Sequence, residues 1–363
     1  MNLDATTRPP IRVLVVDDSA FMRTALTRMI SSDPGVEVAG TACNGSDALD
    51  KIAALNPDVV TLDVEMPVLD GLQTLHYIMQ RFPRPVIMVS SVTERGAEKT
   101  FNALAAGAFD YVPKNLSATS LDIRHIRDDL IAKIHAACQS RRPRSDGASA
   151  RKPPQSSPGQ TREATRHPAP AIVALGTSTG GPKALEEILP LFPRELSVPI
   201  LIVQHMPPGF AGPFAQRLDT MCSVTVREAT HGEPLLPGVV YIAPAGLHMT
   251  VQRPSDSRAL LCLDPHPEDS LNIPSVDVLM TSVAETYANL ALGVILTGMG
   301  DDGARGMRAI HSQGGLTFGQ DEASCTVYGM PRACAELGIL TRVVPLSQIP
   351  AQILKATRYR KRA

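Results

Sequence analysis

Short apolar runs alternate with helical periodicity along most of this chain, and this alternation limits the possible folds more than any other feature of the sequence. Each apolar run is short enough for one buried strand, and the stretches between runs repeat their apolar residues at helical spacing. The predicted strands of the first part are Arg12–Val16, Val36–Ala42, Val59–Leu62, Val86–Val89 and Phe109–Val112. The predicted helices lie near Phe21–Ile30, Asp47–Leu55, Leu72–Arg81, Glu98–Ala106 and Thr119–Cys138. Such alternation predicts a parallel sheet with helices on both faces. In such folds the functional residues lie at the C-terminal ends of the strands.

The alternation resumes after residue 171 and predicts a second, doubly wound and Rossmann-like parallel sheet. Its predicted strands are Ile172–Leu175, Pro199–Gln204, Leu290–Thr297 and Gly315–Gly319, with a helix near Ala304–Ser312. Because 363 residues exceed one typical core, we expect two domains, residues 11–138 and 171–350. Residues 139–170 are rich in arginine and proline without apolar periodicity, which predicts a flexible linker.

Composition excludes several classes of protein. Apolar residues make up 44% and charged residues 20%, and the formal net charge is −1, so no overall field favours nucleic acid or a membrane surface. The basic linker and the basic tail Lys355–Arg362 suit a nucleic-acid arm, but a solvated tether is the favoured interpretation. The nine histidines and six cysteines lack the spacing of a zinc site, and no apolar run reaches the roughly 18 residues of a membrane span. We expect a cytoplasmic protein without membrane insertion.

Acidic side chains follow two strands of the first predicted sheet. Asp17 and Asp18 follow the first strand and Asp63 follows the third, while Ser90 ends the fourth and Lys114 follows the fifth. Three converging carboxylates would repel one another unless a hard cation lies among them, and an oxygen-only set suits Mg²⁺. Any one of these residues alone is better explained as a solvated loop residue or helix cap. Together, at successive strand ends, they indicate a site that accepts a phosphoryl group on a carboxylate.

Residues 11–138 resemble a response-regulator receiver domain, which has a flavodoxin-like fold. The resemblance rests on Asp17-Asp18, Asp63 with Met66-Pro67 and Asp70-Gly71, Ser90, Tyr111 and Lys114. It implies that Asp63 is the phospho-acceptor, that Asp17, Asp18 and Asp63 bind Mg²⁺ and that Lys114 contacts the phosphoryl group. It also implies that Ser90 and Tyr111 relay the switch. One departure is visible, since Lys114 is followed by Asn115 and not by the proline usual in receivers.

A literal G-x-S-x-G, Gly176-Thr-Ser178-Thr-Gly180, joins a predicted strand to a helix that Pro182 opens. Glycines suit a tight strand-to-helix turn, and a hydroxyl held there lies near a helix N-terminus that favours developing negative charge. A nucleophilic serine is one interpretation. On the motif alone, a packing turn or a phosphate cradle is favoured over it.

Two later motifs favour the interpretation of Ser178 as a nucleophile. His205 follows the strand Pro199–Gln204, and the pair Asp301-Asp302 follows the strand Leu290–Thr297. If these strands neighbour the Ser178 strand, a serine, a base and an acid converge where α/β sheets hold their sites. The chain order of serine, histidine and acid differs from that of the α/β-hydrolases. His205 alone is better explained as a packed loop histidine.

The loop Gly298-x-Gly300-x-x-Gly303 also matches a dinucleotide fingerprint, with Asp321 about 20 residues further on. Two carboxylates, Asp301 and Asp302, lie where the pyrophosphate would sit, and they would repel it. We therefore expect these glycines to shape the turn without binding a dinucleotide. We interpret Asp302 as the acid of a triad.

Residues 171–350 resemble the catalytic domain of the chemotaxis methylesterase family CheB. The matching stretches are Gly176–Gly181, Val203–Pro207, Tyr241–Gly246, Ser275-Val-Asp277 and Leu296–Gly303. The resemblance implies that Ser178 is the nucleophile, His205 the general base and Asp302 its orienting acid. Met299 would supply an oxyanion-hole N–H, and Thr179 would line the site.

The same resemblance implies hydrolysis of receptor glutamate γ-methyl esters to glutamate and methanol, and deamidation of receptor glutamines. The implied partners are methyl-accepting chemotaxis receptors and a chemotaxis histidine kinase. Mg²⁺ would serve the receiver, and hydrolysis would need no cofactor. It further implies that the receiver covers the serine site until Asp63 is phosphorylated. A DNA-binding response regulator and an NAD-dependent oxidoreductase are the alternative classes, and both rank far below.

Overall fold

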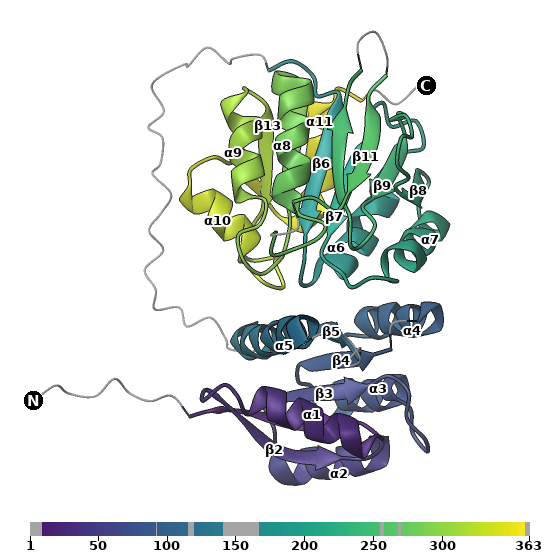
Figure 1. Ribbon diagram of the computed structural model, residues 1–363, viewed down its shortest axis with the longest axis vertical. Coiled ribbons are helices and arrows are strands. Elements are labelled where there is room, and N and C mark those ends of the chain that lie inside the picture. The colour runs from purple at the N-terminus through teal and green to yellow at the C-terminus, as the bar shows by residue number, and fades with distance from the viewer. Residues whose placement is uncertain are drawn as a thin grey trace, which may run out of the picture.

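A computed structural model describes residues 9–91, 93–114, 120–140, 167–254, 258–267 and 270–359. Its two α/β units lie one above the other in Figure 1, each built around its own parallel sheet. Most of the predicted linker, residues 141–166, and the end of the basic tail lie outside the described residues.

The first sheet is parallel throughout, with strand order β2-β1-β3-β4-β5. Its strands are β1 (Ile11–Val16), β2 (Val36–Ala42), β3 (Val59–Asp63), β4 (Val86–Ser90) and β5 (Asp110–Pro113). Its helices are α1 (Ala20–Ile30), α2 (Gly45–Leu55), α3 (Gly71–Arg81), α4 (Glu94–Ala105) and α5 (Ser120–Ser140). Buried side chains join α1 and α5 to one face and α2, α3 and α4 to the other. This order confirms the flavodoxin-like fold.

Side-chain caps fix where helices α1 and α3 begin, after strands β1 and β3. The Ser19 hydroxyl accepts a hydrogen bond from the Met22 N–H, so the cap of α1 lies two residues after Asp17. Asp70 forms a capping box with Gln73 and starts α3. Because each cap satisfies N–H groups that the helix leaves unpaired, it fixes the loop that precedes the helix. The loop that carries Asp17 and Asp18 and the loop that follows Asp63 are held in this way.

The second sheet is also parallel, with strand order β14-β13-β12-β6-β7-β9-β8. Its strands are β6 (Ile172–Thr177), β7 (Ile200–Gln204), β8 (Thr225–Glu228), β9 (Val239–Ile242), β12 (Ala291–Ile295), β13 (Leu316–Gln320) and β14 (Arg342–Val344). A separate antiparallel pair is formed by β10 (His248–Gln252) and β11 (Leu260–Asp264). The chain winds outward in one direction from β6 and in the other from β12. The topological switch point therefore lies between β6 and β12, where such sheets hold ligands.

Helices cover both faces of this second sheet, which confirms a doubly wound fold. Buried side chains join α6 (Gly181–Ile188), α7 (Ala211–Met221) and α11 (Ile349–Ala356) to one face. They join α8 (Val276–Tyr287), α9 (Ala304–Ser312) and α10 (Met330–Glu336) to the other. Short 3₁₀ turns complete the fold at Leu189–Leu191, Ala288–Leu290 and Leu346–Gln348.

An aromatic cluster joins the two units. The ring of Phe210 stacks on Tyr111 of β5 with centroids 4.9 Å apart, and Phe101 of α4 packs against Phe214 at the same distance. All four rings are almost completely buried. The Arg217 guanidinium of α7 donates to the Asn102 side chain of α4 over 2.8 Å. In Figure 1, α4, α5 and β5 are the receiver elements that face the second unit.

Candidate active site

Strand register brings the three residues of the predicted triad to one edge of the sheet. Thr177 of β6 lies opposite Gln204 of β7, and Gly176 lies opposite Ile295 of β12. Ser178 and His205 therefore follow adjacent strand ends, and the loop that carries Asp302 follows the third. The His205 N–H donates to the Thr177 carbonyl over 3.1 Å, which joins the first two strand ends.

The turn that holds Ser178 depends on its glycines. Gly180 has φ +77°, and a Cβ atom there would lie 2.5 Å from Thr326. A Cβ atom on Gly181 would lie within 2.0 Å of the Gln204 side-chain oxygen. The Gln204 side-chain amide in turn donates to the carbonyls of Ser178 and His205, over 3.0 and 2.8 Å. The motif thus brings helix α6 close to the strand and ties the serine turn to the His205 loop.

Gly176 inside β6 allows the closest approach of helix α8. A Cβ atom there would lie 2.2 Å from the Val276 side chain at the start of α8. We expect Gly176→Ala to lower the free energy of unfolding by about 2–3 kcal/mol, because the overpacked helix has to shift. Chemical denaturation measures the change. Gly212→Ala is the control, since Gly212 lies in helix α7 and its Cβ atom would meet only the Glu228 carboxylate at 3.2 Å. Equal stability of the two variants would contradict this account.

His205 and Asp302 are directly joined. The Nε2 atom of His205 lies 2.8 Å from Oδ2 of Asp302, and both side chains are largely buried. Across the described part of the chain, neither Nδ1 of His205 nor the Ser178 hydroxyl has a hydrogen-bond partner. With Nε2 bound to Asp302, Nδ1 is the ring nitrogen left to act on the serine.

Helix α8 holds the Asp302 carboxylate at its N-terminus. Oδ1 accepts hydrogen bonds from the Ser275 hydroxyl and the Asp277 N–H, and Oδ2 accepts one from the Val276 N–H, all within 2.9 Å. Burial acts to raise the pKa of Asp302, but the hydrogen bond and charge of His205 and these backbone N–H groups outweigh it. The pKa of Asp302 is therefore below its usual value. Asp302 is anionic at neutral pH and keeps His205 in a fixed orientation.

Asp277 of helix α8 in turn binds the N-terminus of helix α9. Its Oδ1 atom accepts hydrogen bonds from the N–H groups of Gly303 and Gly306 at the start of α9, over 3.0 and 2.8 Å. Asp302 just before α9 thus binds the start of α8, and Asp277 in α8 binds the start of α9. No role was predicted for Ser275 or Asp277, although Ser-x-Asp at a helix start is an N-cap signal.

The glycine-rich loop after β12 has the tight geometry that its sequence predicts. Gly300 and Gly303 have φ values of +81° and +100°, and a Cβ atom on Gly303 would lie 2.8 Å from Ile295 and Val276. A Cβ atom on Gly298 would lie 3.0 Å from Cβ of Ser178. The loop therefore packs against the serine, and the Met299 N–H is free of hydrogen bonds to any residue in the described ranges.

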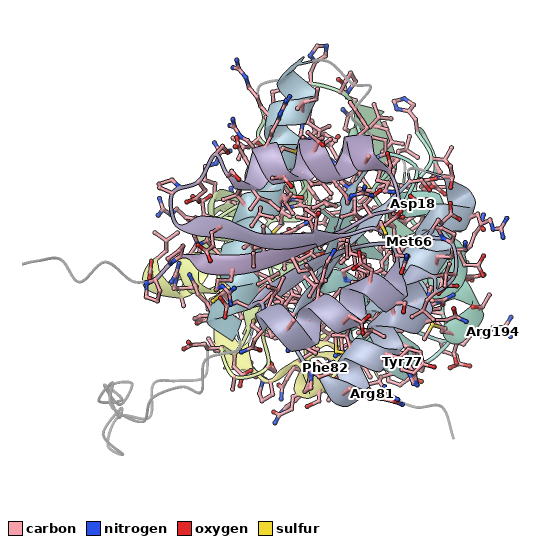
Figure 2. All side chains as sticks on the ribbon, turned by 90° about the horizontal axis from the view of Figure 1, so that it is seen from below. Asp18, Met66, Tyr77, Arg81, Phe82 and Arg194 are labelled. Carbon is pink, nitrogen blue, oxygen red and sulfur yellow. The ribbon has the colours of Figure 1, made fainter. Side chains whose placement is uncertain are left out.

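The acidic residues of the receiver also meet. Carboxylate oxygens of Asp17, Asp18 and Asp63 lie within 4.8 Å of one another. Lys114 contacts two of these side chains, at 2.9 Å from Asp17 and 2.5 Å from Asp63. In Figure 2, which views the receiver from below, Asp18 and Met66 mark the edge where β1 and β3 end.

The receiver site fits a hard cation. Burial raises the pKa of Asp63 to about 6, with Lys114 opposing the rise and Asp17 adding to it. A buried carboxylate with a raised pKa gains stability from a nearby divalent cation, and three carboxylates form the oxygen set that Mg²⁺ prefers. Ser90 is buried at the end of β4, where it accepts a hydrogen bond from the Thr100 hydroxyl of α4 over 2.7 Å.

A cavity of about 260 Å³ contains Ser178, Thr179 and His205, and the receiver forms one of its walls. The receiver side chains that line it are Asp110, Tyr111, Pro113, His125, Ile126, Asp129 and Lys133. Burial raises the pKa of Asp110, and the charge of Lys133, whose Nζ atom lies 3.6 Å from the carboxylate, opposes the rise. The serine therefore lies between the two units.

Fold and site together define a response regulator with a receiver domain and an enzymatic α/β output domain. The sequence model of the CheB methylesterase family matches residues 173–353, and that of the response regulator receiver domain matches residues 13–125. The chain belongs to the CheB methylesterase family.

Curated relatives match nearly the whole chain. The protein-glutamate methylesterase/protein-glutamine glutaminase of Symbiobacterium thermophilum is 47% identical over 96% of this chain and 97% of its own. A protein of the same name from Oleidesulfovibrio alaskensis is 43% identical over 95% of this chain and 99% of its own. The crystal structure of the Thermotoga maritima CheB methylesterase catalytic domain is 38% identical, with a TM-score of 0.50. It covers 52% of this chain and 99% of that one. The described helices include none long and apolar enough to cross a membrane.

Proposed function

We propose that this chain is a phosphorylation-regulated protein-glutamate methylesterase and protein-glutamine glutaminase. Its substrates are the glutamate γ-methyl esters and certain glutamines of methyl-accepting chemotaxis receptors. The observation that carries the proposal is the His205–Asp302 pair beside Ser178 at the switch point of the sheet. The names of relatives at 43–47% identity over nearly the full chain support the choice of substrate.

The chemistry follows from the arrangement of the three side chains. Ser178 attacks the ester carbonyl while Nδ1 of His205 takes the serine proton, and Asp302 holds Nε2 of the resulting imidazolium. The Met299 N–H stabilises the tetrahedral oxyanion, and Thr179 lines the same cavity. His205 then returns the proton to the departing methanol. Water attacks the acyl-enzyme by the reverse proton transfers and yields glutamate, and a glutamine amide releases ammonia by the same route.

The receiver controls access to this site. Asp63 accepts the phosphoryl group from a chemotaxis histidine kinase, Lys114 contacts that group and Asp17, Asp18 and Asp63 hold Mg²⁺. A Mg²⁺ ion held by these carboxylates would neutralise charge on the transferring phosphoryl group. Ser90 and Tyr111 relay the change, and Tyr111 already contacts Phe210 of the catalytic unit. Receiver side chains form one wall of the cavity that holds Ser178, so the receiver has to move before a receptor helix about 10 Å across can approach the serine.

Mass spectrometry of receptor peptides tests the function. Receptor membranes incubated with the full chain, Mg²⁺ and a phosphodonor are expected to lose methyl esters and to convert certain glutamines to glutamate. Membranes without the protein are the control. Unchanged peptides at every methyl-ester and glutamine position would contradict the proposal.

The occluded arrangement predicts that weakening the aromatic cluster activates the enzyme without phosphorylation. We expect Phe101→Ala to raise the basal rate of methanol release several-fold, because Phe101 packs on Phe210 and Phe214 across the units. Phe82→Ala is the matched control, since Phe82 packs within the receiver at the end of α3. Acceptance of phosphate by both variants would show that the receiver remains folded. A basal rate that is unchanged or lower in Phe101→Ala would contradict occlusion.

A further inference from the structure

A chain of hydrogen bonds reaches Asp302 through two buried side chains that the proposed chemistry does not use. The Ser275 hydroxyl donates to Oδ1 of Asp302 over 2.8 Å. The Ser275 N–H donates to Nδ1 of His248 over 3.1 Å, and Nε2 of His248 lies 3.1 Å from the Pro267 carbonyl. His248 is fully buried and Ser275 is 2% exposed. Neither side chain lines the cavity that contains Ser178.

The partners of His248 fix its protonation state. An N–H group can only donate, so Nδ1 of His248 carries no proton where it faces Ser275. A carbonyl can only accept, so Nε2 of His248 carries the proton where it faces Pro267. His248 is therefore neutral and present as one tautomer. That tautomer holds the backbone of Ser275 in place from β10, the strand that packs on α8.

Ser275 also has a fixed hydroxyl orientation. Its oxygen accepts a hydrogen bond from the Val278 N–H as the N-cap of α8, at 3.4 Å. The hydroxyl proton is then directed to Asp302. Because Ser275, Val276 and Asp277 together surround the carboxylate, displacing the start of α8 would turn Asp302 away from Nε2 of His205.

We propose that Ser275 and His248 are positioning residues for the hydrolysis, acting on His205 through Asp302. The inference rests on the proposed methylesterase function and assigns a role to the Ser275-Val-Asp277 stretch. Ser275 sets the orientation of the carboxylate, and neutral His248 sets the position of Ser275. Neither residue touches the substrate, so their loss should act on kcat more than on KM.

Ser275→Ala tests the first part of the inference. We expect kcat for methanol release from methyl-labelled receptor membranes to fall about 10- to 100-fold, with KM unchanged. Ser282→Ala is the matched control, because Ser282 lies on the same helix and its hydroxyl also ties α8 to β10, through the Val251 N–H at 3.1 Å. Ser282 has no contact with Asp302 among the described residues. Equal kcat for the two variants would overturn the role of Ser275.

Two substitutions of His248 test the second part. His248→Asn keeps an acceptor near the position of Nδ1, within reach of the Ser275 N–H. His248→Gln keeps a polar group near the position of Nε2, within reach of the Pro267 carbonyl. Both remove the ring, so their thermal stabilities should fall together, and we expect His248→Asn to retain at least fivefold more kcat than His248→Gln. Equal kcat, or a higher kcat for His248→Gln, would overturn the role of His248.

Ser178→Ala measured in parallel separates this inference from the proposed function. If the native chain releases methanol and Ser178→Ala does not, the function stands, and the four variants above decide the inference. If native protein and Ser178→Ala release methanol equally, the proposed nucleophile is wrong, and the positioning role is overturned with it.

Discussion

Ser178→Ala is expected to lower kcat for methanol release by about 10⁴- to 10⁶-fold, because the variant lacks the hydroxyl that forms the acyl-enzyme in the proposed mechanism. The Ser178 hydroxyl has no hydrogen-bond partner in the described part of the structure. The turn itself is held by backbone contacts, including the Ser178 N–H to the Thr297 carbonyl at 3.1 Å. The variant should therefore fold and accept phosphate as the native chain does.

Steady-state methanol release with phosphorylated protein measures this effect, and thermal unfolding checks the fold. Ser282→Ala is a useful control, since it removes a serine hydroxyl from the same unit at a distance from the cavity. A serine-reactive phosphonate should label the native chain on the peptide that contains Ser178 and should not label Ser178→Ala. Native kcat in a folded Ser178→Ala variant would show that the serine only shapes the turn.

Asp302→Asn is expected to lower kcat by about 10³- to 10⁴-fold. Each carboxylate oxygen accepts two hydrogen bonds, Oδ1 from Ser275 and Asp277 and Oδ2 from Val276 and His205. An amide nitrogen at either position would face a backbone N–H, so donor opposes donor in both orientations of the new side chain. The amide also loses the charge that stabilises the imidazolium.

Asp301→Asn is the matched control for this prediction. Asp301 is exposed next to Asp302, and its backbone carbonyl accepts a hydrogen bond from the Ala304 N–H. We expect Asp301→Asn to keep kcat within about twofold of native, since solvent screens an exposed charge and Asp301 has no side-chain hydrogen bond to Asp302 or His205 among the described residues. The same methanol assay compares the two variants. Comparable losses in both would mean that the loop, and not the Asp302 carboxylate, supports activity.

Much of the fold could be predicted because buried parallel strands are nearly continuous apolar runs. The strand Val36–Ala42 and the helix Ala304–Ser312 have the predicted bounds. Helix α4 begins at Glu94, earlier than the predicted Glu98, because Thr93 caps a first turn that has no apolar periodicity. Strands β8 and β14 were not predicted, since they are short, largely exposed edge strands.

Only those site residues that lie just after a predicted strand, or in the loop that follows it, could be predicted. Ser178, His205 and Asp302 each directly follow an apolar run or lie in the loop after one, and the sheet brings such positions together. The role of helix α8 could not be predicted, because Ser275 lies 27 residues from Asp302 in sequence and no local pattern links them. The contact between the two units could not be predicted either, since an apolar residue such as Phe101 in α4 or Phe214 in α7 is equally well explained as part of the core under its own helix.

The initial rate of methanol release from methyl-labelled receptor membranes, measured with the native chain and Mg²⁺, with and without a phosphodonor, decides whether the chain is a phosphorylation-regulated methylesterase. We expect a low basal rate that rises severalfold with the phosphodonor and no release from Ser178→Ala under either condition. Release from Ser178→Ala equal to that of the native chain, or no release by the native chain under either condition, would contradict the claim.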